Sequence, residues 1–114
     1  MANKLYLCIS QGLSESSLAA LKDCAATAAT MGVEVKVNFA CGGVELVTQG
    51  THERYADIHQ AFEDAREAGA RFYVCEPGLL SRNIQRKDLV EGVEVVGAAT
   101  LVDHALEADQ CLTF

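Results

Sequence analysis

A glycine followed at once by a short apolar run occurs three times in this chain, at Gly32, Gly69 and Gly92. Each glycine comes after a segment that fits a helix, and glycine commonly ends helices. Strands that alternate with helices over short loops pair as parallel neighbours. We therefore predict an α/β fold: a single three-layer domain over residues 1–114, with a mostly parallel five-stranded sheet and helices on both faces. The predicted strands span 4–9, 33–39, 70–74, 93–96 and 110–114.

Two long helices are predicted between these strands. After Ser14, a suitable N-cap residue, apolar residues recur at helical spacing up to Ala28. A second helix has its apolar face at Tyr55, Ile58, Phe62 and Ala65 and is closed by Gly69. The shorter segments are predicted as helical turns at 44–47, a loop at 48–51, a helix or turn at 87–91, and a helix at 101–108 capped by Thr100.

The distribution of charge limits the classes of partner. The formal net charge is −7, and residues 93–114 contain four acidic residues and no Lys or Arg. This argues against a nucleic-acid partner, which needs a basic face, and suits a basic protein partner. No apolar run approaches the roughly 18 residues of a membrane span, and the opening Met-Ala-Asn-Lys lacks the pattern of a secretory signal. We expect a cytoplasmic protein that binds no membrane.

The five cysteines are expected to be free thiols. Their number is odd, no pair forms a C-x-x-C motif, and their separations do not match zinc-ligand spacing. We therefore predict no metal and no cofactor. Cys24 falls on the apolar face of the first helix, and Cys8 and Cys111 lie inside strands, so we expect these three side chains to point into packing. Cys41 and Cys75 remain as candidates for chemistry.

Cys75 follows the strand 70–74 directly, and Glu76-Pro77-Gly78 then turns the chain into a short helix. Proline suits the first turn of a helix, where its missing N–H would be unpaired anyway. A thiol at this point faces free backbone N–H groups and the positive end of the helix dipole, and both favour the thiolate, the form that attacks sulfur. We predict Cys75 as the reactive thiol. The groups expected to stabilise its negative charge are the backbone amides of Gly78 and Leu79 and the side chain of Arg82.

Cys41 is similarly placed after the strand 33–39, although glycines follow it and no basic residue is near. Ligands and chemistry collect beyond the carboxyl ends of parallel strands. Three loops should meet there: Ser10–Gly12, Cys41–Gly43 and Cys75–Gly78. We treat Cys41 as a candidate second thiol that exchanges sulfur or pairs transiently with Cys75. Pairing requires their Cα atoms to come within about 7 Å.

Other chemistries have weaker support. G-x-G-x-x-G, Walker and G-x-S-x-G motifs are absent, and Gly42-Gly43 is too short to cradle a phosphate alone. The three histidines are far apart in sequence, and we predict surface or capping roles for them rather than metal or acid–base work. Asp103 and His104 occupy adjacent helix positions, which point in different directions. The histidines are His52, His59 and His104.

The chain resembles the DsrE/DsrF-like family of small sulfur-relay proteins, which includes the subunits of the TusBCD complex. The likeness covers nearly the whole length and is clearest from Phe72 to Phe114, where a strand ends in Cys75 and residues 88–102 and 108–114 follow the family pattern. In this family the cysteine after the central strand carries a persulfide, and that role transfers to Cys75. Glu76-Pro77 departs from the small or hydroxyl residues common there. Asn83 replaces a common glycine, as asparagine can at a left-handed position.

The resemblance implies an intracellular sulfur-transfer protein. Cys75 would accept sulfane sulfur from a donor protein and pass it to the thiol of an acceptor protein, a sulfurtransferase-like relay. The family also implies assembly of like subunits, as a homo-oligomer (trimer or hexamer) or a hetero-oligomer. Two alternatives stay open: a catalytically inert structural or regulatory subunit of a sulfur-handling complex, and a redox sensor that joins Cys41 and Cys75.

Overall fold

Within residues 3–114, which the computed structural model describes, the five apolar runs form the five strands of one sheet. Met1 and Ala2, which belong to the opening segment without the pattern of a secretory signal, lie outside the described residues. The strand order is β4-β3-β2-β1-β5, and every neighbouring pair is parallel. The predicted fold class is confirmed, and no predicted strand boundary is wrong by more than one residue. The strands are β1 (Lys4–Ile9), β2 (Glu34–Phe39), β3 (Arg71–Cys75), β4 (Val93–Val96) and β5 (Gln110–Thr113).

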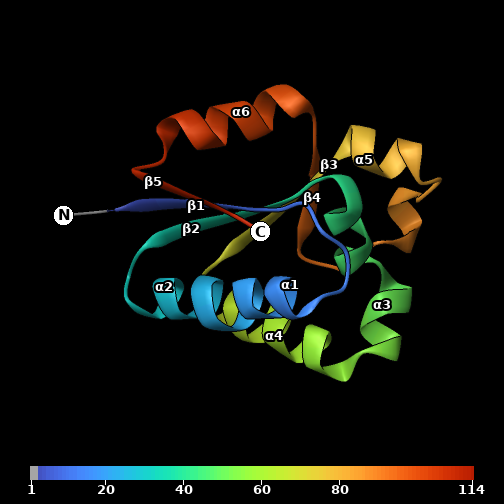
Figure 1. Ribbon diagram of the computed structural model, residues 1–114, viewed down its shortest axis with the longest axis horizontal. Coiled ribbons are helices and arrows are strands. Elements are labelled where there is room, and N and C mark those ends of the chain that lie inside the picture. Colours follow the sequence, from blue (N-terminus) through green and yellow to red (C-terminus); the bar gives the residue numbers. More distant parts are fainter. Residues whose placement is uncertain (1–2) are drawn as a thin grey trace.

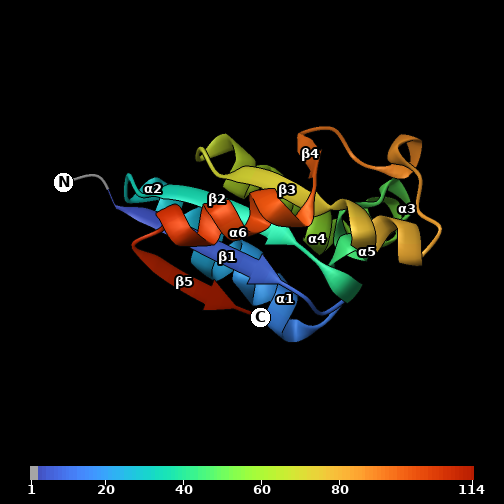
Figure 2. The same cartoon turned by 90° about the horizontal axis from the view of Figure 1, so that it is seen from above.

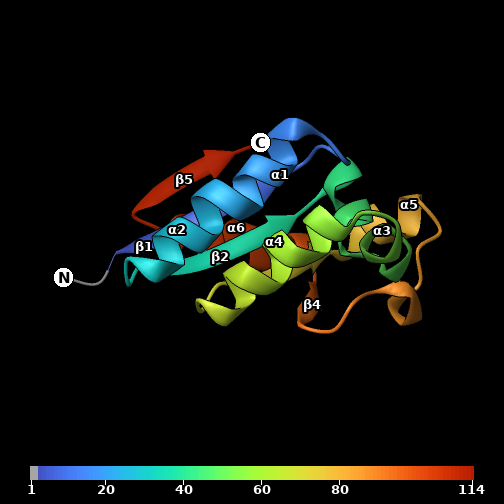
Figure 3. The same cartoon turned by 90° about the horizontal axis from the view of Figure 1, so that it is seen from below.

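Helices cover both faces of the sheet and make three layers (Figure 1). The lower face, as drawn in Figure 1, carries α1 (Glu15–Ala19), the π-helical turn η1 (Ala20–Ala25) and α2 (Ala26–Thr30), which form one continuous run, and beside them α4 (Ala56–Glu67). Figure 3 shows these helices side by side across the underside. The upper face carries α6 (Ala98–Glu107), and Figure 2 shows it crossing above the middle of the sheet. The shorter elements are η2 (Cys41–Val47), α3 (Gln49–Arg54), α5 (Glu76–Ser81) and η3 (Arg86–Asp88).

Three local predictions were wrong. The expected loop at 48–51 begins α3 instead, because the hydroxyl of Thr48 accepts the N–H of Thr51 and caps a helix there. Thr100 is not a cap: α6 already begins at Ala98, since the extended Gly97 starts the helix directly after β4. Tyr55 is the exposed N-cap residue of α4 rather than part of its buried face. The remaining apolar positions predicted for this helix are buried: Ile58, Phe62 and Ala65.

Residues along each strand alternate between the two faces, and the two faces differ in chemistry. The lower side holds the main core, in which the rings of Phe62 and Phe72 stack with centroids 4.2 Å apart. The upper side holds a small cluster formed by Tyr73, Cys75, Val96 and Leu101. Cys75 therefore faces α6. The strand residues in the lower core are Leu7, Ile9, Val35, Val37, Phe39, Phe72 and Val74.

Candidate functional site

The three loops predicted to meet at the carboxyl ends of the strands do so. The N–H of Gly43 donates to the carbonyl of Ser10 at 3.2 Å, which joins the loop after β2 to the loop after β1. Gly43 must be glycine because a Cβ would overlap the carbonyl of Ile9. Gly78 packs against the same loop: a Cβ on it would lie 3.3 Å from the backbone N of Cys41. The first turn of α5 therefore rests on the backbone of Cys41.

Cys75 is both the last residue of β3 and the N-cap of α5, and Pro77 lies in the first turn as predicted. Its backbone is extended, with φ −77° and ψ 119°. The residue is only 9% exposed, because Leu101 of α6 and Val96 of β4 pack in the same small cluster. The thiol predicted to be reactive is therefore shielded by α6 on the upper face.

Cys41 has the opposite exposure. It is the first residue of η2, its side chain is exposed, and its backbone is left-handed with φ 52°. Asn83 also has a left-handed backbone, with φ 54°, which confirms the expectation drawn from its place in the pattern. Glycine or asparagine is usual in this conformation, so Cys41 is an uncommon residue at such a position. The turn that it makes brings the thiol to the rim of the carboxyl edge.

The register of the sheet places Cys41 beside Cys75. Phe39 pairs with Val74, and Ala40 keeps an extended backbone, so Ala40 lies opposite Cys75 and Cys41 comes next. Neighbouring strands are about 4.8 Å apart and successive Cα atoms about 3.8 Å apart, which puts the Cα atoms of Cys41 and Cys75 within about 9 Å of each other. The two candidate thiols therefore belong to one site.

Cys8 is a third thiol near this site. It is half-buried on the upper face of β1, where it pairs with Asn38. Burial raises the pKa of the Cys8 thiol; the hydroxyl of Tyr6 opposes this rise, and the nearby Cys41 and Cys75 add to it. Cys8 is therefore held as a neutral thiol. Within residues 3–114, no group of three or more His, Cys, Asp or Glu side chains is arranged to hold a metal ion.

The other two cysteines lie away from this edge. Cys111 is exposed, so the prediction that it points into packing was wrong. The reason is that β5 is an edge strand whose four residues are all exposed, and the Sγ of Cys111 reaches only the carbonyl of Ala105 at 3.7 Å. Cys24 is half-buried against the lower core, as predicted.

Arg82 lies at the far end of α5 from Cys75. It is the C-cap residue of this helix, and its Nε is 4.0 Å from a carboxylate oxygen of Glu45 on η2. Its Nη1 also donates to the hydroxyl of Ser81. Among residues 3–114, no hydrogen bond or ion pair joins Arg82 to Cys75, so its role as a thiolate stabiliser stays a prediction. Gly78 and Leu79 are the third and fourth residues of α5, and both are buried.

His52 is buried, which overturns the surface or capping role predicted for it. Its ring packs on Phe62, and a nitrogen 2.9 Å from the carbonyl of Leu46 must carry a proton, because a carbonyl can only accept. The other ring nitrogen therefore accepts from Nδ1–H of the exposed His59, 3.0 Å away. Burial lowers the pKa of His52. This pair ties α3 to α4, and short-range periodicity could not show it.

His104 is half-buried under α6 and ties this helix to the sheet. Its Nδ1 donates to the side-chain oxygen of the buried Asn38 at 2.9 Å, and its ring lies against Tyr73. Burial lowers the pKa of His104, and the positive charge of Lys36 lowers it further. Asp103, the adjacent residue, is exposed, so the two side chains diverge as expected. His104 is thus a structural contact of the upper face, and the surface or capping role predicted for it was wrong.

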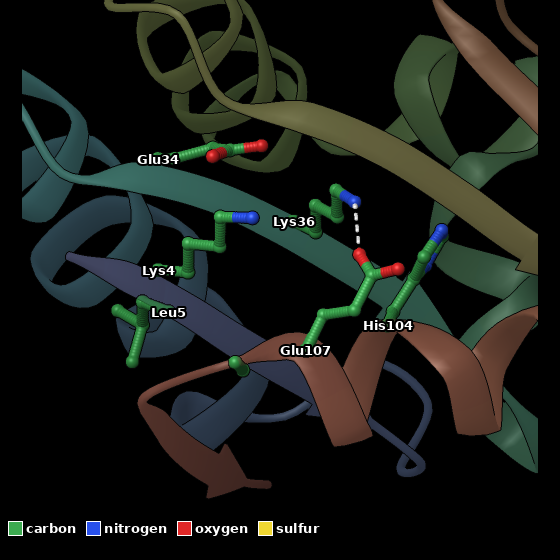
Figure 4. Close-up of a pocket in the computed structure, with 7 residues that line it drawn as sticks. Lys4, Leu5, Glu34, Lys36, His104 and Glu107 are labelled. Atoms are coloured by element: carbon green, nitrogen blue, oxygen red, sulfur yellow. Dashed lines mark ion pairs between the residues drawn. The ribbon is translucent and has the colours of Figure 1, made fainter. Parts of the chain in front are cut away.

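Figure 4 shows a small pocket between α6 and the amino-terminal halves of β1 and β2. Lys4, Glu34, Lys36, His104 and Glu107 line it, and Lys36 pairs with Glu107 at 3.8 Å. Its volume of about 10 Å³ holds at most one water molecule. This end of the upper face therefore offers no ligand site.

In the part of the chain that is described, no helix is long and apolar enough to cross a membrane.

Comparisons with known proteins agree with this architecture. The model of the DsrE/DsrF-like family matches residues 3–114. A protein of Methanopyrus kandleri, named uncharacterized protein MK0008, is 31% identical over 91 residues, which cover 79% of this chain and 75% of the relative. The ychN protein of E. coli has a similar structure, with a TM-score of 0.82, 23% identity and full coverage of both chains. MTH1491 of Methanobacterium thermoautotrophicum gives a TM-score of 0.78 and 20% identity, over 98% of this chain and 99% of its own.

Proposed function

Because this chain belongs to the DsrE/DsrF-like family, which is generally related to sulfur relay, we propose that it is a persulfide carrier. Cys75 accepts sulfane sulfur and passes it to the thiol of a partner protein. The observation that carries this proposal is the place of Cys75, which ends the interior strand β3 and occupies the N-cap position of α5. Donor and acceptor proteins are its partners, in the cytoplasm, and the reaction needs no cofactor.

The chemistry is an exchange at sulfur. The thiolate of Cys75 attacks the outer sulfur of a donor persulfide, the S–S bond of the donor breaks, and the donor leaves as a thiolate. Of the two amides predicted to stabilise the product, Gly78 is better placed. A capping side chain reaches the amide at the second or third helical position, whereas an amide at the fourth position, that of Leu79, bonds to the carbonyl of the capping residue.

Peptide-resolved mass spectrometry tests the carrier role. The protein is incubated with glutathione persulfide, freed of the donor, alkylated and digested. We expect one additional sulfur on the peptide that contains Cys75. The sulfur on this peptide should be absent in Cys75→Ser and present in the matched control Cys24→Ser, whose thiol is half-buried on the other side of the sheet. A Cys75 peptide that never gains sulfur would eliminate the carrier role.

The burial of Cys75 favours a second function, that of a catalytically inert structural or regulatory subunit. Sulfur loading separates the two functions, since an inert Cys75 gains no sulfur from glutathione persulfide, whereas a shielded Cys75 is alkylated slowly in either case. The redox sensor is the third function, and it requires the Cα atoms of Cys41 and Cys75, which the register bounds at about 9 Å, to come within about 7 Å. That function predicts the loss of two free thiols under a mild oxidant, with both cysteines in one cross-linked peptide.

Exposed apolar side chains support assembly with like subunits. Leu106 and Val102 on α6 are 78% and 56% exposed, and Leu80 on α5 is 70% exposed. Such side chains lose contact with water when subunits pack together. We propose a homo-oligomer (trimer or hexamer) or a hetero-oligomer of like subunits. Light scattering after gel filtration tests this, and a monomeric mass at high concentration would rule out the homo-oligomer.

A further inference from the structure

The burial of Cys75 limits which molecules reach it. The cysteine of a partner protein sits on a folded surface, and Leu101 of α6 packs over Cys75 where that surface would have to enter. Cys41 is exposed, one residue beyond the position opposite Cys75 on the neighbouring strand. A partner surface can therefore meet Cys41 without moving α6.

We propose that Cys41 is the thiol that exchanges sulfur with partner proteins, and that Cys75 stores the sulfur that Cys41 delivers. The proposal rests on the proposed function, in which Cys75 carries a persulfide, and gives it a point of entry and exit. The site thereby contains two thiols with different tasks, an exposed one for exchange and a shielded one for storage. Shielding protects a stored persulfide from other thiols in solution.

Packing of α5 on η2 supports a direct transfer between these two residues. Gly78 lets the first turn of α5 approach η2: a Cβ on Gly78 would lie 2.8 Å from Cγ1 of Val44, and 3.3 Å from the backbone nitrogen of Cys41. Cys75 occupies the N-cap position of this same turn. The backbones of Cys41 and Cys75 thus meet at one tightly packed turn at the carboxyl edge.

Cys8 is the competing second thiol, and the structure argues against it. It is half-buried, and burial raises the pKa of its thiol, which keeps it protonated and poorly nucleophilic. Cys8 lies near both Cys41 and Cys75, but unlike Cys41 it is not exposed to the surface of a partner protein. Cys8→Ser is therefore a matched control: it removes a thiol from the same neighbourhood but not from the proposed route.

The transfer has two steps, and neither needs an oxidant or a reductant. In the first, the Cys41 thiolate attacks the outer sulfur of the donor R–S–SH; the S–S bond breaks, and the products are R–S⁻ and Cys41–S–SH. In the second, Cys75 attacks the outer sulfur of Cys41–S–SH. Its thiol proton passes to the leaving Cys41 thiolate, which gives Cys75–S–SH and Cys41–SH. Delivery to an acceptor runs through the same steps in reverse.

A protein-sized donor tests the route. Serum albumin that carries a persulfide on its free cysteine is mixed with wild type, Cys41→Ser, Cys8→Ser and Cys75→Ser, and sulfur on each peptide is followed over time after rapid alkylation. We expect sulfur to occur first on Cys41 and then on Cys75 in wild type. Cys41→Ser should slow loading of Cys75 at least tenfold, and Cys8→Ser should leave it unchanged. Cys41 should still load in Cys75→Ser.

The outcomes separate the two proposals. Loading of Cys75 at the wild-type rate in Cys41→Ser overturns the entry role of Cys41 and leaves Cys75 as the carrier. A slowing in Cys8→Ser that matches the slowing in Cys41→Ser also overturns it. A wild-type protein that loads Cys41 and never Cys75 overturns the carrier function itself. Equal melting temperatures, and a repeat with Cys41→Ala, show that any slowing reflects the lost thiol and not a damaged fold.

Discussion

The two faces of the sheet divide stability and chemistry between them. Below the sheet, the continuous run from α1 to α2 lies beside α4, and the main core contains 21 buried apolar residues. Above it, α6 buries one of its side chains, Leu101, in a cluster of four residues. The upper strand residues include polar and reactive groups such as Cys8, Asn38 and Cys75. A thinly covered face can carry reactive side chains because the other face supplies most of the folding free energy.

The largest loss of stability is expected for a substitution in the core on the lower face. Phe62 is fully buried and stacks on Phe72, so Phe62→Ala leaves a large cavity in the main core. We expect a loss of about 3–5 kcal/mol in the free energy of unfolding. Urea denaturation followed by circular dichroism measures it. A loss smaller than that for Leu101→Ala on the upper face would contradict the conclusion that the lower face supplies most of the folding free energy.

A smaller loss in the free energy of unfolding is expected when a buried side chain of α6 is shortened. Leu101→Ala removes the buried side chain of α6, and we expect a loss of about 2 kcal/mol, at the low end for a leucine, because the site borders solvent. Alkylation of Cys75 should become several-fold faster, while that of Cys41 stays the same. Leu106→Ala on the same helix is the control, because this side chain is already 78% exposed. Unchanged reactivity of Cys75 would mean that another element shields it.

The dependence of stability on pH should come more from His52 than from His104. Burial lowers the pKa of His52, so in the folded protein it lies below the value of about 6.5 in the unfolded chain. The unfolded chain then binds more protons, and stability is lost as the pH falls from about 6.5 through the folded pKa, by at most about 1.4 kcal/mol per pH unit for one group. His52→Gln should flatten this slope.

His104 serves as the comparison on the upper face, because its pKa is lowered in the same direction but the residue is only half-buried. His104→Gln should change the slope less than His52→Gln does. Urea denaturation at a series of pH values between 5 and 8 measures both. A steeper change in the His104 variant would show that α6 contributes more to stability than its buried area indicates.

The smallest effect is expected at the ion pair between Lys36 and Glu107, which joins α6 to β2 (Figure 4). The glutamate side chain is 59% exposed and the charges are 3.8 Å apart, so Glu107→Gln should cost less than about 1 kcal/mol. Salt screens exposed charges, and the difference from wild type should vanish at about 1 M NaCl. A difference that survives high salt would indicate that the residue contributes by packing.

The elements of this protein could be predicted from its sequence, because each depends on short-range patterns. Apolar runs of five or so residues show the strands, helical spacing shows α4, and a glycine with a left-handed backbone precedes three of the strands, as at Gly69. Even the meeting of three loops at the carboxyl edge follows from parallel pairing. The sequence alone thus placed Cys41 and Cys75 at one edge.

The tertiary structure decided which of the cysteine side chains solvent can reach. Runs that are apolar throughout do not show which face of the sheet a helix covers, so the burial of Cys75 under α6 and the exposure of Cys111 on an edge strand had no signal in the sequence. Contacts between residues distant in the sequence also had no signal there. Examples are the contacts of His52 with His59 and Leu46, and that of Arg82 with Glu45. Local propensity determines where an element begins and ends, while exposure depends on how the crossover connections lay the helices over the sheet.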